Sequence, residues 1–288
     1  MNNNKRAQFM TLVSSIAVCI VTLPLFTGTI SAKVAWNILE TITLDDTPID
    51  VAVSHDESLA YILLTKSICV YSLQDKRATD TIPLKGTFSR IILSSDEEKL
   101  YLTDKKSKQV SIINITMIYS IETGNSPVIG KPEAPVSIVA FLDYQCPYCA
   151  KIYPVLEKLA EKYPNDVNLI IKHYPLRMHR FAQKAAQAAL AASQQNKYKE
   201  STQILMANYK NLNDATIKKY IQETGIDMST FDKAFNDPAL QHIISQDMKL
   251  GAQLKVRGVP SLFINGRGVK NRSFDALSRM IESELKKK

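Results

Sequence analysis

The chain has 288 residues, a net charge of +8 at pH 7 and four cysteines. Its charges are mixed in sign, and no basic stripe carries aromatic residues, so the sequence does not support nucleic-acid binding. Four cysteines are too few for a disulfide-rich scaffold, which means that ordinary hydrophobic cores must stabilise the fold. The length allows one large domain or two modest ones.

Residues 1–32 have the pattern of a secretory signal peptide. Lys5 and Arg6 form a positive start, residues 9–26 are mostly apolar, and small and polar residues follow as far as Ala32. This order predicts export and cleavage after Ala32, and so an extracytoplasmic location in the bacterial periplasm or cell envelope, where disulfides persist. The alternative is an uncleaved membrane anchor, because the apolar run is close to the roughly 17 residues that can span a bilayer.

Residues 36–118 contain short runs that alternate between apolar and polar residues, and these predict β-strands joined in antiparallel hairpins. The runs are ETITL, IDVAVS, LAYILL and SICVYSL, followed by DTIPL, SRIILS, KLYLTD and QVSIINI. A shift of 40 positions superimposes identical residues: Ser54 on Ser94, Asp56 on Asp96 and Tyr61 on Tyr101. A period of about 40 residues with four strands in each unit is typical of β-propeller blades.

The segments SHDESLAYILL and SSDEEKLYLTD resemble the YVTN-type family of β-propeller blades. Propellers usually need at least four blades to close, and this chain supplies two. The pair must stand alone, pack on the rest of the chain or be completed by another chain, because uncovered apolar faces and open edges promote aggregation. We expect it to bind a partner or to self-associate; a structural spacer is the alternative. Cys69 lies in one of these strands, where we expect a buried apolar residue.

After a linker at 119–133, residues 134–288 predict an α/β domain. VSIVAFL is a nearly continuous apolar run suited to a strand buried on both faces, VNLIIKHYP is the next such strand, and a helix lies between them. A mostly helical insertion follows at about 178–254, in which Asp214 is the expected N-cap of one helix. Asn265-Gly266 predicts a hairpin, and a final helix runs from Phe274 to about Leu285.

Cys146 and Cys149 stand at the junction of the first buried strand and its helix. Only a thiolate attacks a disulfide, and the free N–H groups and positive dipole at a helix start stabilise an anion at Cys146. Pro147 suits the first helical position, because its missing N–H would have had no partner there. Cys149, nearly one turn further on, is expected to lie deeper and to resolve the mixed disulfide.

Two other interpretations of the cysteine pair are a static structural disulfide and half of a zinc site. Zinc normally takes four ligands. The one other cysteine of the mature chain, Cys69, lies in the other domain, and the histidines show no ligand spacing. No metal is therefore predicted.

Three segments resemble DsbA-like proteins of the thioredoxin superfamily. SPVIGKPEAPVSIVAFLDYQCPYCAKIYPVLEKLAEKY resembles the family's opening, KHYPLRMHRFAQKAAQAALAA its first inserted helices, and VRGVPSLFINGRGV the strand with its cis-proline. The resemblance covers about residues 126–284. It implies an α/β class, a thioredoxin fold with a helical insertion, which here follows a smaller all-β domain of two β-propeller-like blades.

The resemblance also assigns roles around the cysteines. It implies that the Val259–Pro260 bond is cis and that the backbone of Val259 pairs with an extended substrate peptide. Pro147 and Tyr148, between the cysteines, belong to the same active-site loop.

One position departs from the pattern of the family. Relatives commonly carry a buried acidic residue six positions before the first cysteine, and this chain has Ala140 there. Asp143, Lys172 or water is then left to deprotonate Cys149, and the sequence does not choose among them.

The sequence therefore predicts an extracytoplasmic thiol-disulfide oxidoreductase that uses the Cys146–Cys149 disulfide and no other cofactor. As an oxidant it would take electrons from unfolded or folding proteins with cysteines and pass them to a membrane-bound redox partner. A reductase or isomerase of the same fold, kept reduced by a membrane partner, is the alternative within this chemistry. A binding or assembly module with a structural disulfide is the alternative outside it.

Overall fold

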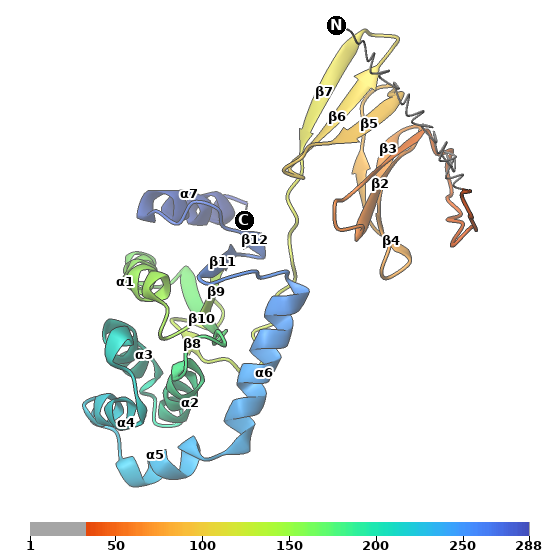
Figure 1. Ribbon diagram of the computed structural model, residues 1–288. Helices are drawn as coiled ribbons and strands as arrows, with labels where there is room; N and C mark the ends of the chain where they lie inside the picture. Colours follow the sequence, from red (N-terminus) through yellow and green to blue (C-terminus); the bar gives the residue numbers. More distant parts are fainter. Residues whose placement is uncertain (1–32, 288) are drawn as a thin grey trace, which may run out of the picture. The chain divides into compact units, whose positions relative to one another are not determined.

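A computed structural model describes residues 33–287 of the protein (Figure 1). The chain divides into two compact units, with the boundary after Thr47. The described part of the first unit, residues 33–47, contains no helix or strand. The predicted signal peptide, residues 1–32, lies outside the described residues. Within residues 33–287, no helix has the length and apolar character needed to cross a bilayer.

Residues 48–115, here called the β-rich region, form two antiparallel sheets. The first sheet contains β1 (Asp50–Val53), β2 (Leu59–Leu63), β3 (Ser67–Ser72) and β4 (Arg77–Pro83), in that order. The second contains β5 (Arg90–Leu93), β6 (Lys99–Asp104) and β7 (Gln109–Asn114). Seven of the eight predicted strands are thus present, and within residues 33–287 the two sheets do not form a closed propeller.

The predicted strand ETITL, residues 40–44, is absent from the structure. Its counterpart one repeat later, DTIPL, lies mostly in β4 and pairs with β3, the strand before it. No described strand comes before residues 40–44, so this segment lacks the preceding neighbour with which β4 pairs. Alternation of apolar residues alone does not make a strand, because a strand also needs a neighbour.

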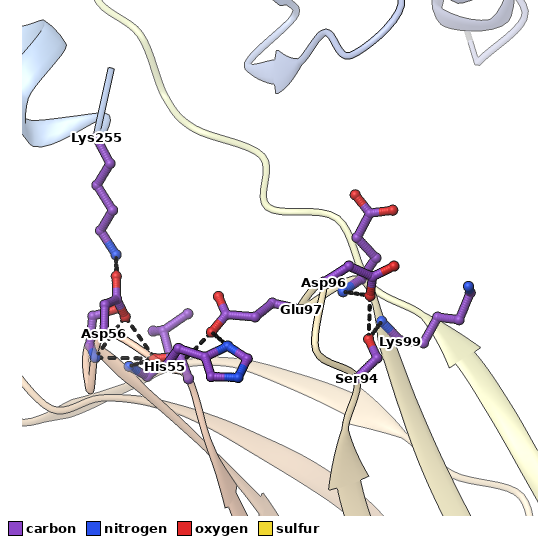
Figure 2. A network of polar contacts seen from close by, with 11 residues as sticks. His55, Asp56, Ser94, Asp96, Glu97, Lys99 and Lys255 are labelled. Atoms are coloured by element: carbon purple, nitrogen blue, oxygen red, sulfur yellow. Dashed lines mark hydrogen bonds and ion pairs between the residues drawn. The ribbon is translucent and has the colours of Figure 1, made fainter. Parts of the chain in front are cut away.

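The two sheets repeat the same turn between their first two strands. Ser54 Oγ donates a hydrogen bond to Asp56 Oδ1 at 2.9 Å. In the second sheet, Ser94 Oγ donates to Asp96 Oδ1 at 2.5 Å (Figure 2). Each aspartate then accepts a bond from the backbone N–H two residues further on, at 3.1 Å. The 40-residue repeat of the sequence is therefore also a repeat of local structure.

A small hydrophobic core lies between the two sheets. Its buried residues are Tyr61, Leu63, Ile68 and Val70 of the first sheet and Ile91, Leu100 and Leu102 of the second. Cys69 on β3 is buried, as predicted, and burial raises the pKa of its thiol.

The rest of the second unit, here called the α/β region (residues 118–287), is built on a five-stranded sheet in the order β12-β11-β9-β10-β8. The strands are β8 (Val128–Ile129), β9 (Val136–Leu142), β10 (Val167–His173), β11 (Ser261–Ile264) and β12 (Arg267–Gly268). Strands β9 and β10 are parallel, and the other pairs are antiparallel. Helix α1 (Pro147–Lys162) connects β9 to β10, which confirms the predicted β-α-β unit.

Five helices form the predicted helical stretch: α2 (Ala182–Ser193), α3 (Tyr198–Ala207), α4 (Asp214–Gln222), α5 (Met228–Phe235) and α6 (Pro238–Gln253). The N-cap of α4 is Asn213 and not the expected Asp214. The Asn213 side chain accepts bonds from the N–H groups of Ala215 and Thr216, both at 3.0 Å. The Thr216 side chain accepts a bond from the Asn213 N–H, which completes a capping box. Asp214 is the first helical residue.

The sheet is covered by helices on both faces (Figure 1). Ala140 and Ile171 of β9 and β10 belong to the large core with α1 and the final helix α7 (Phe274–Leu285). The alternate residues Phe141 and Ile170 belong to a smaller core with Leu250 of α6. This alternation decides which strand residues can reach the cysteines of α1.

The predicted Asn265-Gly266 hairpin joins β11 to β12. Both residues have positive φ, 44° and 76°, as a type I′ turn requires. A Cβ at Gly266 would also lie 2.0 Å from the carbonyl oxygen of Tyr119, so only glycine fits this position.

Candidate active site

Cys146 occupies the N-cap of α1, with φ −78° and ψ 122°, and Pro147 starts the helix as predicted. The Cys146 side chain is nearly buried, with 4% of the residue exposed, and Cys149 is fully buried. Both are present as free thiols. The first cysteine thus occupies the N-cap of α1 without a capping hydrogen bond from its side chain, and the second lies within the core.

The Val259–Pro260 bond is cis, which confirms the prediction. Cys146 Sγ lies 3.7 Å from the carbonyl oxygen of Val259, within reach of a weak S–H···O hydrogen bond. The loop before β11 therefore faces the first cysteine. Between the cysteines, the Tyr148 side chain extends into solvent and is 71% exposed.

The Cys149 thiol is held in a nearly dry environment. Burial, reinforced by the nearby Cys146 and the charge of Asp143, raises its pKa far above the usual value. The backbone N–H of Asp143 donates to Cys149 Sγ at 3.4 Å. Cys149 therefore keeps its proton until a reaction step removes it.

Asp143 is a fully buried carboxylate that joins three segments around the site. Its Oδ1 accepts a bond from the Gln145 N–H at 2.7 Å, and its Oδ2 accepts from the Leu176 N–H at 2.7 Å. The same Oδ2 lies 2.8 Å from His179 Nδ1. The His179 side chain is 21% exposed, so this pair leads from the buried carboxylate next to Cys149 to solvent.

The sequence indicated Asp143 as a candidate proton relay but did not identify His179. These residues are 36 positions apart, and no local pattern joins them. The only signal was that both follow buried strands, β9 and β10, whose parallel pairing places their ends at the same edge of the sheet.

Lys172 was the other candidate relay, and the structure does not bring it to the cysteines. It pairs in register with Phe141, whose side chain faces the core of α6, whereas Cys149 lies in the core on the opposite face. Its Nζ lies 3.1 Å from Asp247 Oδ1 and donates to the Thr123 carbonyl at 2.7 Å. Because successive strand residues point to opposite faces, Lys172 stabilises the fold and is not placed to carry protons for Cys149.

A second buried polar group on the cysteine side of the sheet was not predicted. His173 is fully buried, and burial lowers its pKa to about 4. Its Nε2 lies 3.2 Å from the Tyr198 hydroxyl, while Nδ1 has no hydrogen-bond partner. Tyr144 stacks on its ring with centroids 5.9 Å apart. A neutral imidazole satisfies these contacts.

Metal ligands do not gather around this site. Across the described part of the chain, no three His, Cys, Asp or Glu side chains form a group that could hold a metal ion.

The parallel β-α-β unit, the cysteine pair at the start of its helix and the cis-proline loop that faces the first cysteine define a class of protein. The protein has a thioredoxin-like fold that carries two cysteines at the start of its first long helix. The family model described as "Thioredoxin" matches residues 122–283, and the chain belongs to this family.

Individual relatives support the class. A thioredoxin-like oxidoreductase from Silicibacter pomeroyi DSS-3 is 30% identical, with a TM-score of 0.52 over 57% of this chain and 94% of its own. The Bacillus cereus protein named "Probable disulfide bond formation protein D" is 28% identical over 198 residues, which are 65% of this chain and 87% of that protein.

Another relative is a much longer protein, and only part of it matches. The Na(+)/H(+) antiporter NhaA 3 of Salinispora tropica is 32% identical over 154 residues, 53% of this chain and 24% of the antiporter. The chain thus spans about a quarter of the length of such curated relatives.

Proposed function

We propose that the protein oxidises cysteine pairs in exported, folding proteins, and that the Cys146–Cys149 disulfide is its only redox group. The observation that carries this proposal is the 3.7 Å approach of Cys146 Sγ to the Val259 carbonyl. An extended peptide that pairs with the Val259 backbone brings its own sulfur close to Cys146. Main-chain pairing tolerates many sequences, as a catalyst of folding requires.

The exchange starts from the oxidised enzyme. A substrate thiolate attacks Cys146 Sγ, so that the substrate–Cys146 bond forms and the Cys146–Cys149 bond breaks, with Cys149 leaving as a thiolate that takes a proton. A second substrate thiolate then attacks the substrate sulfur, which forms the substrate disulfide and releases Cys146 as a thiolate. Two electrons pass from the substrate dithiol to the enzyme.

Asp143 and His179 are the proposed proton route for Cys149. The raised pKa of this thiol favours prompt protonation of the leaving thiolate in the oxidising direction. The same property makes deprotonation slow in the reverse direction unless a base is close. The Asp143–His179 pair connects the residue whose N–H binds Cys149 Sγ with a partly exposed imidazole.

The proposed direction requires a partner that reoxidises the enzyme. We assign this role to a membrane-bound redox protein, and the predicted export signal places both in the cell envelope. A reductase or isomerase kept reduced by a membrane partner remains the competing function, and the reduction potential of the pair distinguishes the two directions.

We also propose that the β-rich region self-associates with a second copy. In the first sheet, the face that carries Tyr61 and Val70 is covered by the second sheet. Their counterparts 40 positions later are Tyr101 and Val110, but Val110 is 63% exposed.

The uncovered face of the second sheet is broad and apolar. Ile92, Tyr101 and Ile112 pair in register across β5, β6 and β7, and Ile92 and Ile112 are 51% and 60% exposed. The first sheet packs its corresponding face on another sheet of the same kind, so a β-sheet of a second copy is the partner that we propose for this face. Two copies would supply the four blades that a propeller needs.

The catalytic proposal is tested by oxidation of a reduced, unfolded test protein with catalytic amounts of enzyme. Cys146→Ser should lower the rate to that of the redox buffer alone, because Cys146 carries the sulfur that faces the Val259 carbonyl. Cys69→Ala, which removes a buried thiol in the β-rich region, is the matched control and should keep the wild-type rate. Full activity of the Cys146→Ser variant would contradict the proposal.

A structural disulfide is distinguished by its resistance to reduction. A catalytic Cys146–Cys149 bond should exchange with millimolar glutathione within seconds to minutes, and a bridge that stays intact would mean a non-catalytic binding module.

A further inference from the structure

A groove of about 340 Å³ lies beside the cysteine pair on the surface of the α/β region. Its apolar wall consists of Tyr148, Ile152, Val155, Pro260 and Phe274. Tyr148 stands between the two cysteines, and Pro260 follows the residue whose carbonyl faces Cys146. A peptide that pairs with the Val259 backbone therefore continues into this groove, which can hold one large apolar side chain.

Two cations line the same groove from different elements. Lys151 extends from the first turn of α1, and Arg272 lies in the loop before α7. Both are exposed, and neither forms an ion pair with any residue between 33 and 287. The acid closest to Arg272 in sequence, Asp275, makes no ion pair with it.

Some cations elsewhere in the α/β region do have acidic partners. Lys162 Nζ on α1 lies 3.8 Å from Glu282 Oε1, and Arg267 Nε on β12 lies 3.2 Å from Glu284 Oε1. Lys151 and Arg272 have no such partner within residues 33–287, so both remain available to a ligand.

The loops that surround the cysteines extend this positive charge. Arg177 and Arg180 flank His179 in the segment that binds the Asp143 carboxylate, and Arg257 precedes Val259 by two residues. All three are exposed, and within the described residues none forms an ion pair. The one carboxylate at the centre of the site, Asp143, is buried and fully hydrogen-bonded. A substrate segment that reaches Cys146 thus passes exposed positive charge on three neighbouring loops.

We propose that the groove selects acidic substrate segments, in which a large apolar side chain and at least one Asp or Glu lie within a few residues of the reacting cysteine. This inference rests on the proposed function and adds its substrate class. The apolar side chain occupies the wall of the groove, and Lys151 and Arg272 bind the carboxylates. Charge complementarity of this kind raises the rate of encounter and discriminates between partners.

The test compares two reduced dithiol peptides of equal length that share one large apolar residue and differ only in flanking glutamates or lysines. The oxidised full-length protein is mixed with each peptide, and the second-order rate of exchange is measured. Each rate is divided by that of the same peptide with glutathione disulfide, because neighbouring charges also change the reactivity of the peptide's own thiols. We expect the acidic peptide to react about tenfold faster at low ionic strength, and the preference to shrink as salt is added.

Variants locate the preference in the groove. Lys151→Glu and Arg272→Glu should each reduce it, and the double variant should abolish or invert it. Lys158→Glu on α1 and Arg279→Glu on α7 make the same charge changes at exposed positions outside this groove and should keep it.

The outcomes separate this inference from the function on which it rests. Equal normalised rates for the two peptides would overturn the inference and leave the oxidase proposal intact. An equal loss of preference in the control variants would also overturn it, because the net charge of the protein would then be the cause. If neither peptide is oxidised, the proposed function itself fails.

Discussion

The β-rich region and the α/β region of this protein bury their apolar residues in different ways. The β-rich region encloses a small core between two sheets and leaves Ile92, Val110 and Ile112 largely exposed. The α/β region covers both faces of its sheet with helices, and its two cysteines lie at the edge of a large continuous core. The β-rich region thus exposes an apolar sheet face, whereas the α/β region covers its sheet and holds the cysteine pair.

This difference indicates a division of labour. The titratable groups to which we assign roles in exchange belong to the α/β region. They are held by contacts between distant segments, such as those of Asp143 with Leu176 and His179. The β-rich region is defined by local turns that repeat after 40 residues. Changes in the α/β region should therefore alter chemistry and pH response, whereas changes on the open face of the β-rich region should alter association alone.

Among changes that leave the cysteines in place, the largest effect on the rate of exchange is expected from His179→Gln. Glutamine can still donate a hydrogen bond to Asp143 but cannot carry a proton, so the steps that protonate or deprotonate Cys149 should slow by about 10- to 100-fold. Stopped-flow kinetics of a single exchange would measure this, and added imidazole should restore part of the rate. His242→Gln, an exposed change on α6, is the control.

An unchanged rate in His179→Gln would contradict the proposed proton route through Asp143 and His179. Water would then carry the proton of Cys149. A loss of rate that imidazole does not rescue would mean that His179 only positions Asp143.

A second effect concerns the stability of the fold at low pH and depends on His173. Burial lowers the pKa of this histidine to about 4. Above pH 6.5 the imidazole is neutral in both the folded and the unfolded state. As the pH falls from 6.5 towards 4, the unfolded chain binds a proton that the folded protein does not, so the free energy of unfolding falls by up to roughly 3 kcal/mol.

His173→Phe keeps a ring of similar size between Tyr144 and Tyr198 and removes the titration. Urea unfolding at pH 7 and pH 4.5 should show a smaller loss of stability for this variant than for the wild type. Equal losses in the two proteins would mean that other groups cause the pH dependence.

The smallest effect on catalysis is expected from Ile112→Lys on the open face of β7. The added charge should prevent a second copy from packing there, while the rate of exchange stays within about twofold of the wild-type value. Light scattering should report the mass of a monomer for the variant and a higher mass for the wild type. Lys66→Glu, an exposed change in the turn between β2 and β3, is the control. A monomeric wild type would remove the proposed role of this face.

Sequence reasoning predicted the parts of the site that depend on residues close together in the chain. Cys146, Pro147 and Cys149 lie on one helix start, Asn265-Gly266 has only one favourable turn, and the Val259–Pro260 loop resembles a known motif. Local backbone chemistry determines the first two features, so a short stretch of sequence is enough to predict them, whereas only the resemblance implied the cis bond of the third.

Features that depend on pairing between distant segments were missed or misplaced. Lys172 was a candidate because its strand neighbours the site, but its register with Phe141 turns the side chain to the opposite face. His179 contacts Asp143 only because two strand ends meet at one edge of the sheet. Likewise, ETITL has the alternation of a strand but follows no described hairpin with which to pair.

The central claim is that the Cys146–Cys149 pair is an oxidant, and its equilibrium reduction potential tests this most directly. The full-length protein is equilibrated with glutathione buffers, and the fraction of reduced pair is measured by thiol alkylation. We predict a value near about −120 mV, at the strongly oxidising end of the scale for this fold. A value near about −270 mV would contradict the account, because the pair would then donate electrons to its substrates.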